Sequence, residues 1–190
     1  MKVKVFFVFC YLFYSFGYAQ EYEDLYNKIS NLKYSYEYDE IDCEIIDATK
    51  YILEQPYEEE VLKNNFAYKS LMKWMDSTEV YHVIVGGKIL EHCDKGSVLY
   101  NMSKISMTQY IFDNDSIVQT SISRGFRYVN IHRVREIIYG GGEIFMEYLN
   151  KQKNKTIKAK INKSLKKGLK QYREGQFETF MSYKKGSYLD

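Results

Sequence analysis

Four arginines between residues 124 and 135 form the sharpest chemical cluster in a chain that otherwise mainly uses lysine. The arginine cluster comprises Arg124, Arg127, Tyr128, His132, Arg133 and Arg135. A guanidinium group binds carboxylate, phosphate or sulfate through two parallel hydrogen bonds, which the point charge of lysine cannot do. The cluster is therefore a candidate anion site for an acidic glycan, a lipid headgroup or an acidic loop of a partner protein. The more ordinary alternative is that these arginines pair with the acidic first half of the chain, or with Glu136 or Glu143.

Nucleophilic, phosphate-binding and metal chemistry find little support in the sequence. No serine lies in a nucleophile-elbow pattern, and the glycine fingerprints of P-loops and dinucleotide sites are absent. No pair among the three histidines has the helical spacing of a zinc site. A metal site made by His82, His92 and Cys93 is an alternative, but Glu91 and Asp94 beside them make a surface turn the simpler interpretation. We predict no catalytic residue, no metal site and no cofactor.

The first 19 residues have the composition of a secretory signal peptide. Lys2 and Lys4 precede an apolar run over residues 5–16, and small residues lie just before a cleavage point after Ala19. The run is too short for a membrane span, which needs about 20 apolar residues. We therefore expect residues 1–19 to be removed and the protein to be periplasmic or secreted, with an uncleaved anchor as the alternative.

Two cysteines, Cys43 and Cys93, belong to the chain after this cleavage. In an oxidising compartment they could close one disulfide bridge. Cys43 lies on a predicted helix and Cys93 beside a turn, so two unpaired buried thiols are the alternative.

Charge divides the chain into two unlike halves. Residues 20–100 carry 8 Lys and Arg against 17 Asp and Glu, a net charge of −9, and residues 101–190 carry 17 against 8, a net charge of +9. Much of the positive charge lies on a predicted helix over residues 157–173. A basic helix could bind a membrane surface or a glycan, although a solvated lysine face needs no partner. We expect the two halves to pack against each other, and export argues against a nucleic acid partner.

The helix that follows the arginine cluster should organise the fold. Its apolar residues recur at steps of three and four over residues 131–149, the period of one helical face. Gly140, Gly141 and Gly142 lie in its middle, and each costs about 0.5–1 kcal/mol relative to alanine. Because the apolar period continues through the glycines, we predict that another backbone crosses there; a break in the helix is the alternative.

The remaining pattern predicts an all-α fold, an irregular bundle of five to six helices. Residues 20–39 should be a polar leader segment, residues 40–183 a single helical domain and residues 184–190 a tail. Trp74 should anchor the core, with a sugar-stacking platform as the alternative. Further helices are expected over residues 41–55, 56–75, 98–112 and 117–128, together with a short last helix that carries Phe177, Phe180 and Met181.

A small β-hairpin is expected near residues 80–92. Residues 80–85 are rich in β-branched residues, and Gly86 and Gly87 form a two-residue turn signal. Residues 88–92 would return as the second strand. The alternative is an extended segment that leads into a helix.

Four short motifs resemble uncharacterised small exported helical proteins of Bacteroidota-type bacteria. The motifs are Tyr51-Ile52-Leu53 before Pro56, Lys73-Trp74-Met75 with Ser77-Thr78, Phe145-Met146-Glu147-Tyr148, and Leu165-Lys166-Lys167 before Glu174-Gly175-Gln176-Phe177. The chain departs from that pattern in its triple glycine. The resemblance implies a periplasmic or secreted helical domain, and it implies no activity.

These observations favour a non-catalytic module that binds a protein, a glycan or another anionic ligand after export. A membrane surface is a less favoured partner. The alternative is a small exported hydrolase that uses carboxylates, as glycosidases do. A cleft with two carboxyl groups about 5–9 Å apart would support the hydrolase. A cleft lined by Arg124, Arg127 and Tyr128 without such a pair would support the binding module.

Overall fold

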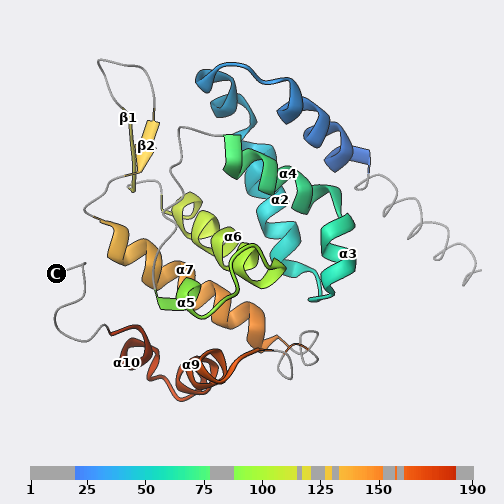
Figure 1. Ribbon diagram of the computed structural model, residues 1–190. Coiled ribbons are helices and arrows are strands. Elements are labelled where there is room, and N and C mark those ends of the chain that lie inside the picture. Colours follow the sequence, from blue (N-terminus) through green and yellow to red (C-terminus); the bar gives the residue numbers. More distant parts are fainter. Residues whose placement is uncertain are drawn as a thin grey trace, which may run out of the picture.

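The structure is predominantly helical, as the sequence predicts (Figure 1). This computed structural model describes residues 20–77, 88–114, 117–120, 127–129, 133–151, 157 and 161–182. The helical elements are residues 20–31, η1 Ser35–Ile41, α2 Asp42–Glu54, α3 Glu59–Asn64, α4 Phe66–Ser77, α5 Lys88–Glu91, α6 Val98–Phe112, α7 Val134–Asn150, α9 Lys163–Arg173 and α10 Phe177–Met181. The all-α class is confirmed, but the described residues hold more helical segments than the five to six expected. Among these helices, none combines the length and apolar character that a membrane span requires.

Helix α6 is the most enclosed element of the described fold. The Ser97 side chain accepts a hydrogen bond of 3.1 Å from the backbone N–H of Tyr100 and so caps its first turn. Every residue from Ile105 to Gln109 is buried, because α7 packs on one side of α6 and α2 on another (Figure 1). Buried hydroxyl groups on this helix donate to carbonyl groups one turn earlier, as Ser106 does to Met102 at 2.9 Å. Polar residues are therefore accommodated on a helix that has almost no solvent-facing side.

Helix α7 crosses α6 at the three glycines. It runs unbroken from Val134 to Asn150, and Gly140, Gly141 and Gly142 are all buried. A β-carbon on Gly141 would lie 2.6 Å from the Met107 Cα of α6, too close for any side chain. The prediction of a close backbone crossing is confirmed, and the alternative of a broken helix is wrong.

The segment over residues 20–31, expected as a polar leader, is a helix that joins the core. Tyr22, Leu25 and Ile29 are buried at steps of three and four. The hydroxyl of buried Ser70 on α4 donates to the Tyr22 carbonyl at 3.2 Å. This apolar face is narrow and lies among acidic residues and tyrosines. The helical period is therefore hard to recognise in the sequence.

The helix expected over residues 56–75 is two helices, α3 and α4. Gln55 is extended and ends α2, as expected for the residue before a proline. The second break falls at Asn65, which is also extended. Its side-chain oxygen accepts from the backbone N–H groups of Ala67 at 2.9 Å and Tyr68 at 3.4 Å, so Asn65 caps the new helix.

The prediction of a helix over residues 117–128 is wrong. Strands β1 Val118–Thr120 and β2 Arg127–Val129 pair antiparallel there, with Val118 opposite Val129 and Thr120 opposite Arg127. β-branched residues favour the extended backbone, and residues 117, 118 and 120 are all β-branched. The preference of these residues for the extended backbone therefore outweighs the weak helical period of the segment.

The hairpin expected near residues 80–92 is wrong in its second strand. Residues 88–91 form the short helix α5, and adjacent Ile89 and Leu90 are both buried. A strand sends adjacent side chains to opposite faces, whereas one turn of helix places both toward the core. Residues 80–87 lie outside the described part of the chain.

The two C-terminal helices close the fold below α7 (Figure 1). Asn162 caps α9 by accepting a hydrogen bond of 2.9 Å from the backbone N–H of Leu165. Gly175 takes a φ of +69° and turns the chain into α10. Phe177, Phe180 and Met181 of α10 are buried, as predicted.

Candidate functional site

The arginine cluster is only partly placed by the structure. Arg127 and Tyr128 belong to strand β2, Arg133 precedes α7, and Arg135 is exposed in its first turn. Arg124 and His132 lie outside the described residues. Arg133 and Arg135 therefore come from one helix start, and neither lines the cleft described below.

The guanidinium group of Arg133 is bound to a carboxylate of its own helix. Its Nε and Nη2 atoms lie 2.7 Å and 2.5 Å from the two carboxylate oxygens of Glu136. The hydroxyl of Tyr110 also donates to Glu136, at 3.1 Å. The hydrogen bonds from Arg133 and then from Tyr110 hold the pKa of Glu136 below its usual value. For Arg133, pairing with Glu136 is the correct interpretation. Its guanidinium group already makes two hydrogen bonds to this carboxylate, so that edge of the group is not open to an external anion.

The two cysteines are both free, so the candidate disulfide between Cys43 and Cys93 is wrong. Cys43 is exposed on α2, whereas Cys93 is buried just after α5. Burial, helped by the nearby carboxylate of Asp94, raises the pKa of the Cys93 thiol to about 12. Cys93 is therefore an inert core residue at neutral pH.

The histidine motif beside Cys93 is structural where it is described. The His92 ring lies 6.0 Å from the ring of Phe180, and the His92 carbonyl accepts a 2.6 Å hydrogen bond from Asn162. Within the described residues, no three His, Cys, Asp or Glu side chains gather as a metal site would require. His82 lies outside those residues.

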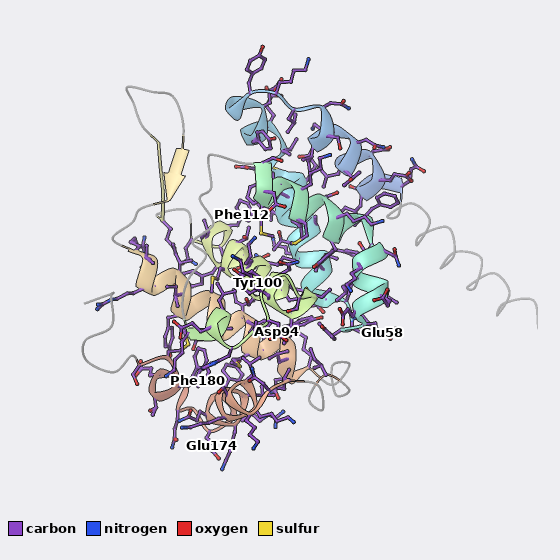
Figure 2. The ribbon with its side chains drawn as sticks, in the orientation of Figure 1. Glu58, Asp94, Tyr100, Phe112, Glu174 and Phe180 are labelled. Carbon is purple, nitrogen blue, oxygen red and sulfur yellow. The ribbon has the colours of Figure 1, made fainter. Side chains whose placement is uncertain are left out.

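Exposed positive charge is concentrated on α9. The basic face of α9 consists of Lys163, Lys166, Lys167, Lys170 and Arg173. These exposed residues follow one another at steps of three, one, three and three, which places them on one side of the helix, while Leu165, Gly168 and Leu169 face the core. Figure 2 shows side chains with nitrogen atoms pointing outward around α9, near the labelled Glu174.

Three members of this face have no counter-ion among the described residues. Lys170 lies 3.7 Å from Glu174, and Arg173 donates to the Asn150 side chain at 2.7 Å. The side chains of Lys163, Lys166 and Lys167 make no ion pair or hydrogen bond with any residue that the structure describes. The N-terminal half of the basic face is therefore open to an external anion.

Packing of the two halves does not neutralise this face. The halves do meet, because α2 packs on α6 and Lys151 at the end of α7 lies 2.5 Å from Glu54 at the end of α2. Other acidic residues of the first half pair locally, as Glu44 does with Lys28 at 2.8 Å. The basic residues of α9 in the second half of the chain thus remain exposed in the folded molecule, and the described residues of the acidic first half do not neutralise them.

A cleft of about 250 Å³ lies where α2, α6 and α7 end together. Its charged lining residues are Lys50, Glu54, Asp113, Glu147 and Lys151. The Lys151 ammonium is held by Glu54 and, at 3.4 Å, by the Leu53 carbonyl. Glu147 is exposed on the last turn of α7.

Buried polar groups form the floor of this cleft. Gln109 of α6 donates from Nε2 to the Asp113 carboxylate at 2.7 Å. Tyr148 of α7 lines the same cleft, and its burial raises the pKa of its hydroxyl. The sequence analysis identified neither residue as part of a site, and no motif in the sequence marks either of them as such.

No known protein family, curated protein or solved structure matches this chain.

Proposed function

We propose that this chain is an exported, non-catalytic module that binds an anionic glycan through the basic face of α9. The observation that carries the proposal is that Lys163, Lys166 and Lys167 share one exposed helix face without an acidic partner among the described residues. Carboxylate or sulfate groups along a polysaccharide would supply the missing counter-charge. Lysines bind such groups as point charges, so the interaction needs charge density and little geometric selectivity.

Export is part of the same proposal, and it rests on the N-terminal sequence. Lys2 and Lys4, the apolar run after them and the small residues before Ala19 support cleavage between Ala19 and Gln20. The resemblance to small exported helical proteins agrees with it. The intact mass of the protein recovered from the periplasmic or culture fraction tests this directly, because the exported chain should begin at Gln20.

Binding to dextran sulfate, a sulfated polysaccharide, tests the partner class. The double variant K166Q/K167Q should bind more weakly than the wild type at low salt, since each lysine near an anionic surface contributes about 1 kcal/mol. The matched control is K33Q/K95Q, which removes the same charge from exposed lysines outside α9. The proposal fails if both double variants lose the same affinity.

A membrane surface is the competing source of negative charge, and the same variants separate it from a glycan. Vesicles that contain phosphatidylglycerol offer charge at a planar surface, and tight membrane binding also needs an apolar face that can insert. The apolar side of α9 is buried: Leu165 and Leu169 are 0% and 3% exposed. We therefore expect weaker binding to vesicles than to dextran sulfate, and stronger binding to vesicles would favour a membrane partner.

The second candidate, an exported carboxylate hydrolase, is favoured by one observation. Three carboxyl groups, those of Glu54, Asp113 and Glu147, line the cleft, as general acid–base chemistry would require. Two of them already bind side chains of this protein, Lys151 and Gln109 respectively. We expect no hydrolysis of a panel of chromogenic glycosides, and turnover that E147Q abolishes would establish the hydrolase instead.

A further inference from the structure

We infer that Gln20, as the first residue of the exported chain, closes on itself to form pyroglutamate, a five-membered lactam without a terminal charge. The inference rests on the cleavage after Ala19 that the proposed function includes, and it adds a covalent modification to that cleavage. It stands on the identity of the residue that cleavage exposes, on the accessibility of Gln20, and on the way the helix over residues 20–31 is held.

Cleavage after Ala19 makes Gln20 the residue that carries the free α-amino group. The amide carbon of a terminal glutamine is spaced from its own α-nitrogen so that the two close an unstrained five-membered ring. The residues on either side, Ala19 and Glu21, carry no side-chain amide. A cut one residue earlier or later would therefore leave no terminal amide to react.

The atoms of the ring closure balance within Gln20 alone. The neutral α-nitrogen attacks the side-chain carbonyl carbon Cδ, so that the N–Cδ bond forms and the Cδ–Nε2 bond breaks. Nε2 leaves as ammonia with a proton that the attacking amine gives up, and no oxidant, reductant or water is consumed. Because α-amino groups titrate close to neutral pH, an appreciable fraction of them is neutral and able to attack.

Gln20 is open to this reaction in the folded protein. It is exposed at the start of the helix over residues 20–31. Its Nε2 atom donates to the Asp24 carboxylate at 3.3 Å, a long hydrogen bond between exposed side chains that holds the amide only weakly. The side chain can therefore turn back toward its own nitrogen while the helix stays folded.

The helix that begins at Gln20 does not depend on a terminal ammonium group. Tyr22 is 6% exposed, and its carbonyl accepts a hydrogen bond of 3.2 Å from the hydroxyl of Ser70 on α4, so the helix is docked close to its first residue. The first N–H groups of a helix have no acceptor within it, so a lactam N–H at Gln20 removes no helical hydrogen bond. The modified residue therefore fits the same helix start.

The lactam would protect this docked segment. Aminopeptidases bind a free α-ammonium group, which pyroglutamate lacks, in the way that other blocked N-termini lack their charge. Trimming of residues 20–22 would remove Tyr22 from the core and end its contact with Ser70. The modification thus closes the end of the chain at which such trimming would begin.

The intact mass of the exported protein tests the inference. The full chain is expressed, and the mass of the protein from the periplasmic or culture fraction is measured before and after incubation at neutral pH. We expect a chain that begins at residue 20 and is lighter than its unmodified sequence by the mass of one ammonia. Fragmentation of the intact chain should place this loss on the first residue, which separates it from loss of ammonia at an asparagine elsewhere.

Two variants link the loss of mass to Gln20. Q20E keeps the length of the side chain but replaces the amide by a carboxylate that has no ammonia to release, so it should retain the full mass of a chain that begins at residue 20. Q176E, at an exposed glutamine just before α10, is the matched control. It should lose one ammonia as the wild type does.

The possible outcomes separate this inference from the export on which it rests. A chain that begins at Gln20 and keeps its full mass after incubation would overturn the inference and leave export intact. A cut at another position, or an equal loss of ammonia from Q20E and the wild type, would also overturn it. A chain recovered with residues 1–19 still attached would contradict the proposed cleavage itself.

Discussion

A β-carbon placed on Gly141 of α7 would lie 2.6 Å from the Cα atom of Met107 in α6, which is closer than any two such atoms approach in proteins. The contact is between two backbones, so no change of rotamer could relieve it. The flanking glycines also face neighbours: Gly140 faces the Tyr110 ring, and Gly142 faces the Ile89 side chain. The whole arrangement of α7, α6 and α5 depends on this approach.

We predict that G141A destabilises the fold by about 3 kcal/mol or more, the upper end of the range for overpacked cores. G140A should cost less, because the Tyr110 ring that it meets is partly exposed and can move. Urea denaturation measures both changes. E143A, an exposed position on the same helix, is the control and should lie within about 0.5 kcal/mol of the wild type. Equal stability of G141A and E143A would show that the helices do not cross there.

The sequence was sufficient for the long, strongly periodic helices. α6 begins and ends where its apolar pattern predicts, and α7 was identified together with the reason for its glycines. The apolar period that continues through the three glycines favoured a backbone crossing over a break in the helix, so the inference needed no knowledge of the partner. The identity of the partner segment, Met107 to Tyr110, could not be predicted, because pairing of helices is decided by the whole core.

The errors occur where local signals are weak or compete. Around Val118 and Thr120, β-branched residues outweigh a poor helical period, and at Asn65 a single side chain ends one helix and caps the next. The cleft at Gln109 could not be predicted, since it is formed by three helix ends that are distant in sequence. The lysines of α9 were visible in the sequence. It could not be predicted that Lys163, Lys166 and Lys167 make no ion pair with any described residue.

The pKa of Glu136 offers a test of the arginine pairing. It lies below the ordinary value of 4.5 because of the hydrogen bonds from Arg133 and Tyr110. A carboxyl group with a lowered pKa stabilises the fold above its ordinary pKa, and this contribution is lost as the pH falls through the lowered value. In R133Q we therefore expect the pKa of Glu136 to rise toward 4.5, as measured by NMR titration of the carboxyl carbon. R173Q, which removes an arginine bound to Asn150, should leave that pKa unchanged.

Thiol reactivity should distinguish the two cysteines. In a protein that begins at Gln20 and so lacks Cys10, Ellman's reagent should modify Cys43 at once, because it is exposed. Cys93 should react only after unfolding, because burial and the raised pKa of about 12 leave almost no thiolate at neutral pH. C43S should remove the fast reaction entirely. Protection of both thiols, restored by a reducing agent, would instead indicate a bridge.

Fluorescence of Trp74, the single tryptophan of the chain, tests its assignment to the core. Its side chain is 0% exposed and its ring lies 5.9 Å from the ring of Phe112. We expect emission at a shorter wavelength than in the unfolded protein, little quenching by acrylamide and no change on addition of oligosaccharides. A change that saturates with an oligosaccharide would support the sugar-stacking platform.

The dependence of binding on salt tests the proposed function most directly. Each lysine that neutralises a fixed anion releases a counter-ion, so the logarithm of the affinity for dextran sulfate should fall linearly with the logarithm of the salt concentration. The slope for K166Q/K167Q should be shallower than that of the wild type by about one unit for each lysine removed, while K33Q/K95Q should keep the wild-type slope. Identical slopes for all three proteins, or a wild-type affinity that does not change with salt, would contradict binding through the basic face of α9.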